Sequence, residues 1–134
     1  MDGYRHRIMD SLLEKKLQAK GAVLIEGPKW CGKTTTAEEI AVSKILLART
    51  DVKNNFKSLL EIDTDAALSG DTPMLIDEWQ TVPKLWDAVR YTVDHRRKMG
   101  QFILTGSAVP DKEAEEEREH SGTGRFAWLT MRPM

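Results

Sequence analysis

The chain has 134 residues, 40% of them hydrophobic and 31% charged, which fits one soluble globular domain rather than a disordered or membrane protein. Twenty basic and 21 acidic residues leave a net charge of −1, so the basic excess of a dedicated nucleic-acid binder is missing, although a local basic patch remains open. The single cysteine, Cys31, rules out an intramolecular disulfide and a zinc site built from several cysteines.

The first half of the chain predicts two helices and two strands. Apolar residues recur at helical spacing over residues 4–19, and a buried strand is indicated by the apolar run at 22–26. A helix is expected from 34 to about 42, and a second strand at 44–48. No apolar stretch has the length of a secretory core or of a membrane span. We therefore expect a cytoplasmic protein.

The second half continues the alternation. Helices are predicted at 52–60 and 84–97, and strands at 74–77, 101–106 and 125–131, while the stretch up to Pro73 reads as irregular with one short helical turn. The charge run at 111–120 is typical of a solvated helix face or a mobile loop. Strands separated by helices predict an α/β fold: a parallel sheet of about five strands with helices on both faces.

A phosphate-binding loop is predicted between the first strand and the helix that follows it. Gly27, Gly32, Lys33 and Thr34 fit the pattern G-x-x-x-x-G-K-[ST], in the place between strand and helix that its mechanism requires. Backbone N–H groups of such a loop converge on phosphate oxygens, helped by the helix N-terminus. The alternative is a glycine turn that merely caps the strand.

The residues of this loop have distinct expected roles. Lys33 would reach the β- and γ-phosphates, Thr34 would offer its hydroxyl to Mg²⁺, and Thr35 would donate near the α-phosphate. The rest of the nucleotide contact would come from the loop itself: Gly27, Pro28, Lys29, Trp30, Cys31 and Gly32. Cys31 is read as a small residue that tolerates the turn, with a redox switch as the alternative.

Two adjacent carboxylates, Asp77 and Glu78, end the apolar run at 74–77. The carboxyl ends of parallel strands open onto one crevice, so this pair should face the phosphate loop. Because adjacent strand residues point in different directions, Asp77 would hold Mg²⁺ while Glu78 orients and polarises water. A carboxylate pair opening a surface loop is the alternative. Gln80 is expected to be a surface glutamine, with a contact to water as the alternative.

Hydroxyl groups end the next strand. Thr105 and Ser107 could lie between the phosphate loop and Glu78 and sense the γ-phosphate, while a turn around Gly106 is the competing interpretation. Trp79 and Trp86 flank an apolar helix and are therefore expected to pack in the core or an interface rather than to stack on bases.

Four segments carry a family resemblance: "GAVLIEGPKWCGKTTTAEE", "PMLIDEWQTVPKLWDAVR", "GQFILTGSAVPD" and "HSGTGRFAWLTMRPM". In this order and spacing, the chain resembles the ATPase portion of the prokaryotic ATP-binding proteins of the AAA superfamily, whose full-length members carry a C-terminal nuclease-like domain. The resemblance implies a metal-binding Asp77 beside the catalytic Glu78. It also implies that Arg125 can act on the nucleotide of a neighbouring subunit in a homo-oligomer. An ordinary solvated arginine is the alternative.

The same resemblance implies that residues 1–134 are the AAA-type P-loop NTPase core of a longer protein, whose lid and C-terminal domain lie beyond Met134. Nucleic acid would then be a partner only through that further domain. The expected function is Mg²⁺-dependent ATP binding and hydrolysis, weak or absent in this form of the chain. A nucleotide-dependent switch without turnover is the alternative. A small-molecule kinase fits less well, since no cluster of lid arginines is visible. Whether ATP or GTP is preferred stays open.

Overall fold

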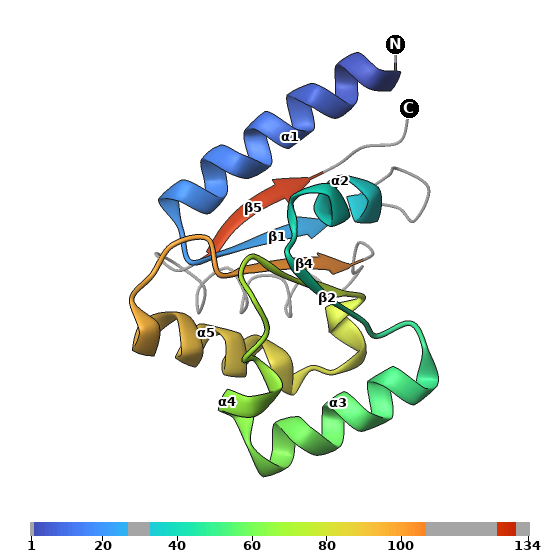
Figure 1. The fold of residues 1–134 in the computed structure, drawn as a ribbon, viewed down its shortest axis with the longest axis vertical. Helices are drawn as coiled ribbons and strands as arrows, with labels where there is room; N and C mark the ends of the chain where they lie inside the picture. The colour runs from blue at the N-terminus through green and yellow to red at the C-terminus, as the bar shows by residue number, and fades with distance from the viewer. Residues whose placement is uncertain (1, 27–32, 107–125, 131–134) are drawn as a thin grey trace, which may run out of the picture.

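The computed structural model describes residues 2–26, 33–106 and 126–130. Their strands form one parallel sheet in the order β2-β3-β4-β1-β5 (Figure 1). The strands are β1 (Ala22–Glu26), β2 (Ser43–Leu46), β3 (Met74–Asp77), β4 (Phe102–Gly106) and β5 (Phe126–Thr130). The helices are α1 (Asp2–Ala19), α2 (Lys33–Ile40), α3 (Thr50–Ile62), α4 (Thr64–Ala67), the short 3₁₀ helix η2 (Trp79–Thr81) and α5 (Lys84–Arg96).

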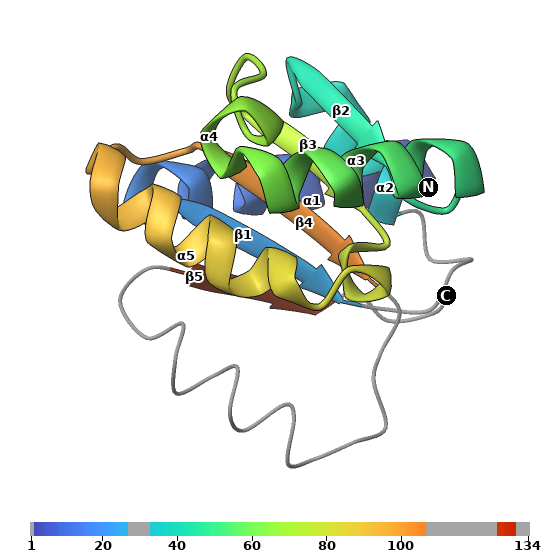
Figure 2. The same cartoon turned by 90° about the horizontal axis from the view of Figure 1, so that it is seen from below.

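Helices cover both faces of the sheet. Figure 1 shows α1 and α2 on one face and α3, α4 and α5 on the other, and Figure 2 shows the second group in front of the strands. The side chains of β1 alternate accordingly: Val23 and Ile25 pack with α1 and α2, whereas Ala22 and Leu24 join the core beneath α3 and α5. Burial on both faces explains why β1 reads as an unbroken apolar run. The predicted α/β fold is confirmed.

The observed elements follow the predicted ones closely, with one addition. Each predicted strand is present, and the helix expected at 52–60 extends over Thr50–Ile62. The helical turn expected before Pro73 is α4, which begins after Asp63, whose side chain accepts a hydrogen bond from the backbone N–H of Ala66 at 3.2 Å. The helix η2 has no counterpart in the prediction. The predicted helix or loop at 111–120 lies outside the described residues.

The strand register brings the carboxyl ends of β1, β3 and β4 together on the same side of the sheet. Glu26 of β1 lies beside Gly106 of β4, and Thr105 of β4 lies beside Asp77 of β3. Since β4 runs between β1 and β3, it separates the strand that precedes the predicted phosphate loop from the strand that carries the two carboxylates.

The opposite edge of the sheet is held by polar contacts. Backbone N–H groups of Gly100 and Gln101 donate to the carbonyls of Lys20 and Gly21 at 2.9 and 2.8 Å. Arg96 donates to the Leu68 carbonyl at 2.9 Å and to the side chain of Gln101 at 3.3 Å. These contacts join α1, α4 and α5 to the start of β4. Among the described helices, none is both long and apolar enough to cross a membrane.

Candidate nucleotide site

The predicted phosphate loop lies between two described elements. Strand β1 ends at Glu26 and helix α2 begins at Lys33, so a strand precedes the motif and a helix follows it, as its mechanism requires. The loop residues Gly27, Pro28, Lys29, Trp30, Cys31 and Gly32 lie outside the described residues. Lys33, Thr34 and Thr35 form the first turn of α2, and their side chains are not described. Their contacts with phosphate remain predictions.

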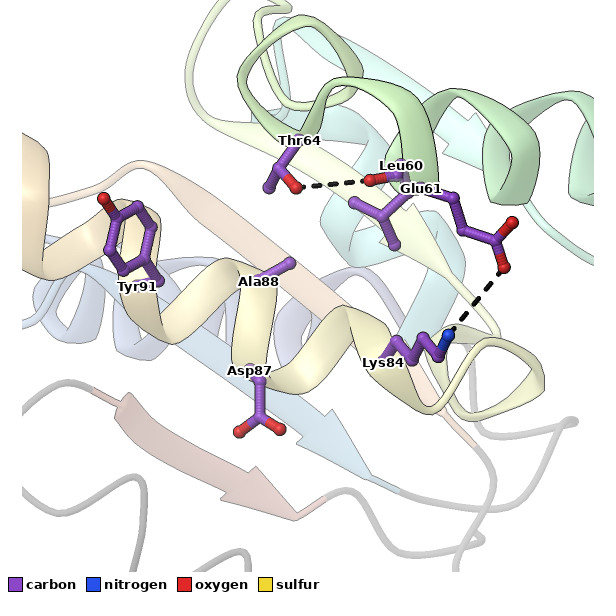
Figure 3. A pocket seen from close by; sticks show the side chains of 7 residues that line it. All are labelled: Leu60, Glu61, Thr64, Lys84, Asp87, Ala88 and Tyr91. Carbon is purple, nitrogen blue, oxygen red and sulfur yellow. Dashed lines mark hydrogen bonds and ion pairs between the residues drawn. The ribbon is translucent and has the colours of Figure 1, made fainter.

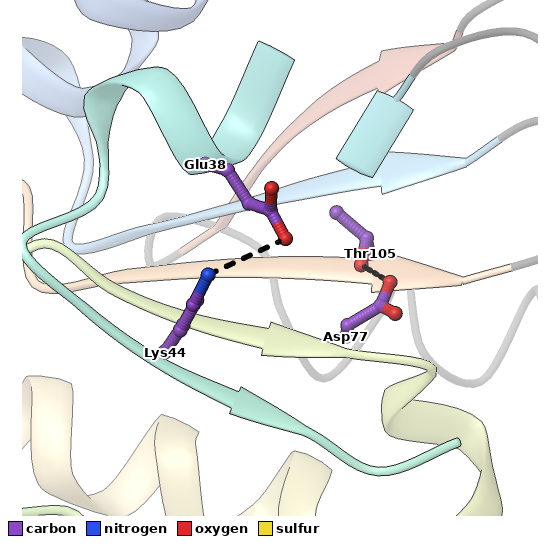
Figure 4. A network of polar contacts seen from close by, with 4 residues as sticks. All are labelled: Glu38, Lys44, Asp77 and Thr105. Atoms are coloured by element: carbon purple, nitrogen blue, oxygen red, sulfur yellow. Dashed lines mark hydrogen bonds and ion pairs between the residues drawn. The ribbon is translucent and has the colours of Figure 1, made fainter. Parts of the chain in front are cut away.

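Asp77 and Thr105 form the described centre of the site. The Thr105 hydroxyl donates a hydrogen bond to Oδ1 of Asp77 at 2.5 Å, and the two residues are register partners on β3 and β4 (Figure 4). An ionised carboxylate only accepts hydrogen bonds, so the proton belongs to the hydroxyl. Thr105 is completely buried, whereas Asp77 is partly exposed. Each residue lies two positions after a residue that packs on the α2 face, Leu75 and Ile103; strand alternation therefore directs both side chains to that face.

Figure 4 also shows an ion pair between two exposed side chains on the same face of the sheet. Lys44 of β2 reaches Glu38 of α2, with Nζ and Oε1 3.8 Å apart. Both side chains are solvent-exposed, so this ion pair contributes little to stability. The pair joins strand β2 to helix α2. It is separate from the hydrogen bond between Asp77 and Thr105.

Glu78 leaves the strand in a left-handed backbone conformation. Its φ and ψ are 56° and 46°, a region that costs a non-glycine residue about 1–3 kcal/mol. The strand therefore ends at Asp77, and the chain turns at once into η2. The different directions of Asp77 and Glu78 arise from this turn, not from the strand alternation that the sequence suggested. No glycine, asparagine or proline marks position 78, so no sequence signal announced the turn.

Gln80 is the residue that the sequence prediction placed wrongly. It is partly buried, and its Nε2 donates to Oε2 of Glu78 at 2.5 Å. Its Oε1 is buried and has no hydrogen-bond partner among the described residues. The short helix η2 brings this side chain back toward the strand end, which sequence periodicity could not reveal because three residues show no period.

The two tryptophans pack in the core, as predicted. The ring centroids of Trp79 and Trp86 are 5.3 Å apart, and Trp86 stacks on Phe126 of β5 at 4.0 Å. Both indoles are at most 6% exposed. This aromatic stack packs η2 and α5 against Phe126 of β5, and its first member, Trp79, directly follows Glu78. Ser107 and Arg125 lie outside the described residues, so their roles remain predictions.

A separate open groove lies on the other face of the molecule. It has a volume of about 560 Å³ and runs between α3 and α5 (Figure 3). The residues that line it are Leu60, Glu61, Thr64, Lys84, Asp87, Ala88 and Tyr91. An ion pair between Lys84 and Glu61, 3.8 Å long, crosses one end of the groove. Since Asp77 and Thr105 point to the opposite face of the sheet, the groove is distinct from their site.

Comparisons with known proteins give the family. Two proteins named as uncharacterised, from Mycobacterium bovis and Mycobacterium tuberculosis, are each 33% identical over 100 residues, which is 74% of this chain and 22% of each relative. The chain thus spans about a fifth of the length of these curated relatives. A solved structure of PCH-2 from C. elegans aligns with 96% of this chain and 41% of its own, at 16% identity and a TM-score of 0.49. The AAA domain family matches residues 19–134. With this match over most of its length, the chain belongs to the AAA domain family.

Proposed function

We propose that this chain is the Mg²⁺-dependent ATP-binding and ATP-hydrolysing core of a longer protein. The observation that carries the proposal is the placement of Asp77 and Glu78 at the carboxyl end of β3, on the sheet edge where β1 ends and α2 begins. An AAA domain and this edge together support a nucleotide-binding, ATPase-type module. Ligands of open α/β sheets bind at the carboxyl ends of the strands.

The residues of the site fit Mg²⁺. Asp77 offers carboxylate oxygens and Thr34 a hydroxyl, and Mg²⁺ prefers oxygen ligands from one or two carboxylates together with substrate phosphates and water. Within residues 2–26, 33–106 and 126–130, no three His, Cys, Asp or Glu side chains gather as a metal cluster, and a site of this kind needs none. When bound, Mg²⁺ would neutralise charge on the phosphates.

The remaining roles follow from chemistry and position. Lys33 would bind the β- and γ-phosphates, and Glu78 would orient the attacking water. We propose that Thr105 acts through Asp77, because its only hydroxyl proton is donated to that carboxylate. Ser107, directly after β4, stays the proposed contact to the γ-phosphate.

Arg125 is proposed to act on the nucleotide of a second subunit. Phe126, the next residue, is the register partner of Ala22 at the start of β1. The end of β1 at Glu26 is four residues further along, about 13 Å at the usual rise of a strand. The start of β5 therefore lies at the sheet edge opposite to Asp77, which favours action between subunits over action within one chain.

Binding is tested first with Lys33→Ala. Removing this charge should weaken ATP binding at least tenfold, about 1.4 kcal/mol, because a charge-assisted contact to phosphate is lost while the backbone of the loop remains. Isothermal titration calorimetry with Mg·ATP measures the change. Equal affinities for the two proteins would contradict the phosphate-loop assignment.

Hydrolysis is tested with a matched pair of acid-to-amide variants. Glu78→Gln should keep Mg·ATP binding while phosphate release falls about 10²–10⁴-fold, as expected for loss of a general base. Asp77→Asn should instead weaken the Mg²⁺ dependence of binding.

A separate measurement distinguishes the alternative functions. Phosphate release without any added acceptor separates an ATPase from a kinase. Binding of ATP without phosphate release in the complete protein would favour a nucleotide-dependent switch.

A further inference from the structure

The carboxylate of Glu78 is held by a side chain from its own turn. The left-handed backbone at Glu78 folds the chain into η2, and this turn returns Gln80 to Glu78, where Nε2 donates to Oε2 at 2.5 Å. The contact is a charge-assisted hydrogen bond between groups two residues apart. Because Asp77 is held by Thr105, each of the two adjacent carboxylates has its own hydrogen-bond donor.

Gln80 is itself confined by the end of β4. A Cβ atom added to Gly106 would lie 2.6 Å from Oε1 of Gln80 and 3.0 Å from Nε1 of Trp79. The first distance is shorter than real Cβ contacts, so a side chain at position 106 would displace the amide of Gln80, whereas glycine leaves it in place. Gly106 on one side and Glu78 on the other therefore fix the side chain of Gln80.

Within the described residues, no hydrogen bond offsets the burial of the Gln80 amide oxygen. Oε1 of Gln80 is buried without a hydrogen-bond partner among the described residues, and an unpaired buried polar atom is unfavourable. A methionine of similar length would fill the same space without burying an amide oxygen. What the glutamine adds is a donor aimed at Glu78.

We propose that Gln80 is the positioning residue of Glu78: it fixes the carboxylate orientation in which Glu78 directs the attacking water. The proposal rests on the hydrolytic function proposed above. Glutamate has three side-chain torsions, and catalysis depends on holding a reacting group within a narrow range of orientations. The contact that carries this role is made to Glu78, so we expect the loss of Gln80 to affect turnover and not nucleotide binding.

The kinetic test compares Gln80 with Gln101, which lies at the opposite ends of the strands. Gln80→Met, in the complete protein, should lower kcat for ATP hydrolysis at least tenfold and leave KM for ATP within twofold. Gln101→Met is the matched control, because Gln101 is buried at the other end of β4 and donates to the Lys98 carbonyl at 2.7 Å. That variant loses an amide from the core too, yet its kcat should stay within twofold of wild type.

A second measurement does not depend on turnover. The side-chain amide of Gln80 gives a ¹⁵N–¹H signal that is assigned by its loss in Gln80→Met. Removal of the acceptor in Glu78→Ala should shift this signal and leave that of Gln101 in place, and Gly106→Ala should shift it as well. An unmoved Gln80 signal in Glu78→Ala would overturn the inference, whatever the hydrolysis rate.

The outcomes separate the two proposals. Wild-type kcat in folded Gln80→Met would overturn the positioning role alone. Absence of phosphate release from the complete wild-type protein would overturn the proposed hydrolysis and the positioning role with it. A decrease of kcat in Gln80→Met with a normal rate in Gln101→Met, together with the shifted amide signal, would establish Gln80 as the residue that orients Glu78.

Discussion

Two buried threonines show how differently one hydroxyl group can contribute to this fold. Thr105 is completely buried at the end of β4 and donates to Asp77. Thr92, in the middle of α5, is 2% exposed, and its hydroxyl has no partner in the described part of the chain. The first hydroxyl satisfies a carboxylate, whereas no group of the described residues offsets the burial of the second.

Replacing each threonine by valine should therefore give opposite results. Thr105→Val should lower the free energy of unfolding by about 1–2 kcal/mol, because the partly exposed Asp77 loses a buried donor. Thr92→Val should change it by less than about 0.5 kcal/mol or raise it, since valine has the same shape and a similar helix propensity. Chemical denaturation measures both. A larger loss in Thr92→Val than in Thr105→Val would contradict this assignment of hydrogen bonds.

The same residues mark the limit of sequence prediction at the site. The positions of Asp77 and Thr105 were predictable, because each ends an apolar run, and parallel strands bring their carboxyl ends together. The turn at Glu78 was not, since glutamate carries no preference for left-handed backbone. The contact of Gln80 depends on that turn and on the space above Gly106, and both are consequences of tertiary packing.

At the scale of elements, the junction of α1 and β1 depends on close approach by α5. A Cβ atom on Gly21 would lie 2.2 Å from Cγ1 of Val93 and 3.1 Å from Cγ2. Valine in a helix has one strongly preferred rotamer, so it cannot rotate away without strain. The absence of a side chain at Gly21 thus allows α5 to pack closely against the amino end of β1.

This junction predicts a compensation between two substitutions. Gly21→Ala should destabilise the protein by about 1–3 kcal/mol through overpacking. In Val93→Ala, the two methyl groups are absent, and the added methyl of Gly21→Ala should be accommodated. The double variant should then lose at least about 1 kcal/mol less than the sum of the single losses. Strict additivity of the three unfolding free energies would show that the two residues do not limit each other.

Element lengths explain which parts of the fold could be read from the sequence. Strands β1, β3 and β4 were predicted because burial on both faces leaves continuous apolar runs. The helices α4 and η2 span four and three residues, too few for a helical period to show. For α4, a signal was present in Asp63, whose side chain caps the turn.

The whole molecule is organised around β4, which lies between β1 and β3. Alternating strands and helices predict a parallel sheet but not this order, because the order depends on which strand inserts between two others. The parallel register has a second consequence: it places the start of β5, directly after Arg125, at the edge opposite to Asp77. If Arg125 acts on the nucleotide, as proposed above, a complete site requires two subunits.

Mixing two inactive variants of the complete protein tests this requirement. Arg125→Ala and Glu78→Gln should each hydrolyse ATP poorly, and an arginine finger can be worth about 10³–10⁵ in rate. In a mixed assembly, some interfaces join an intact Arg125 to an intact Glu78, so part of the phosphate release should return. Hydrolysis by the wild type should also rise with protein concentration. If the variants co-assemble without any recovery, action between subunits is wrong.

The insertion of β4 beside β1 also determines the order in which the chain can fold during its synthesis. Ala22 pairs with Phe102, which follows it by 80 positions, whereas β2 and β3 pair over a shorter interval. At about 5–20 residues per second, a ribosome needs about 4–16 s to make those 80 residues. During that time β1 has neither of its neighbours, and its apolar residues stay available for wrong pairing. If the proposed phosphate loop binds ATP, the nucleotide can stabilise this domain only late in synthesis, because the strand that precedes the loop is fixed only after β4 has been made.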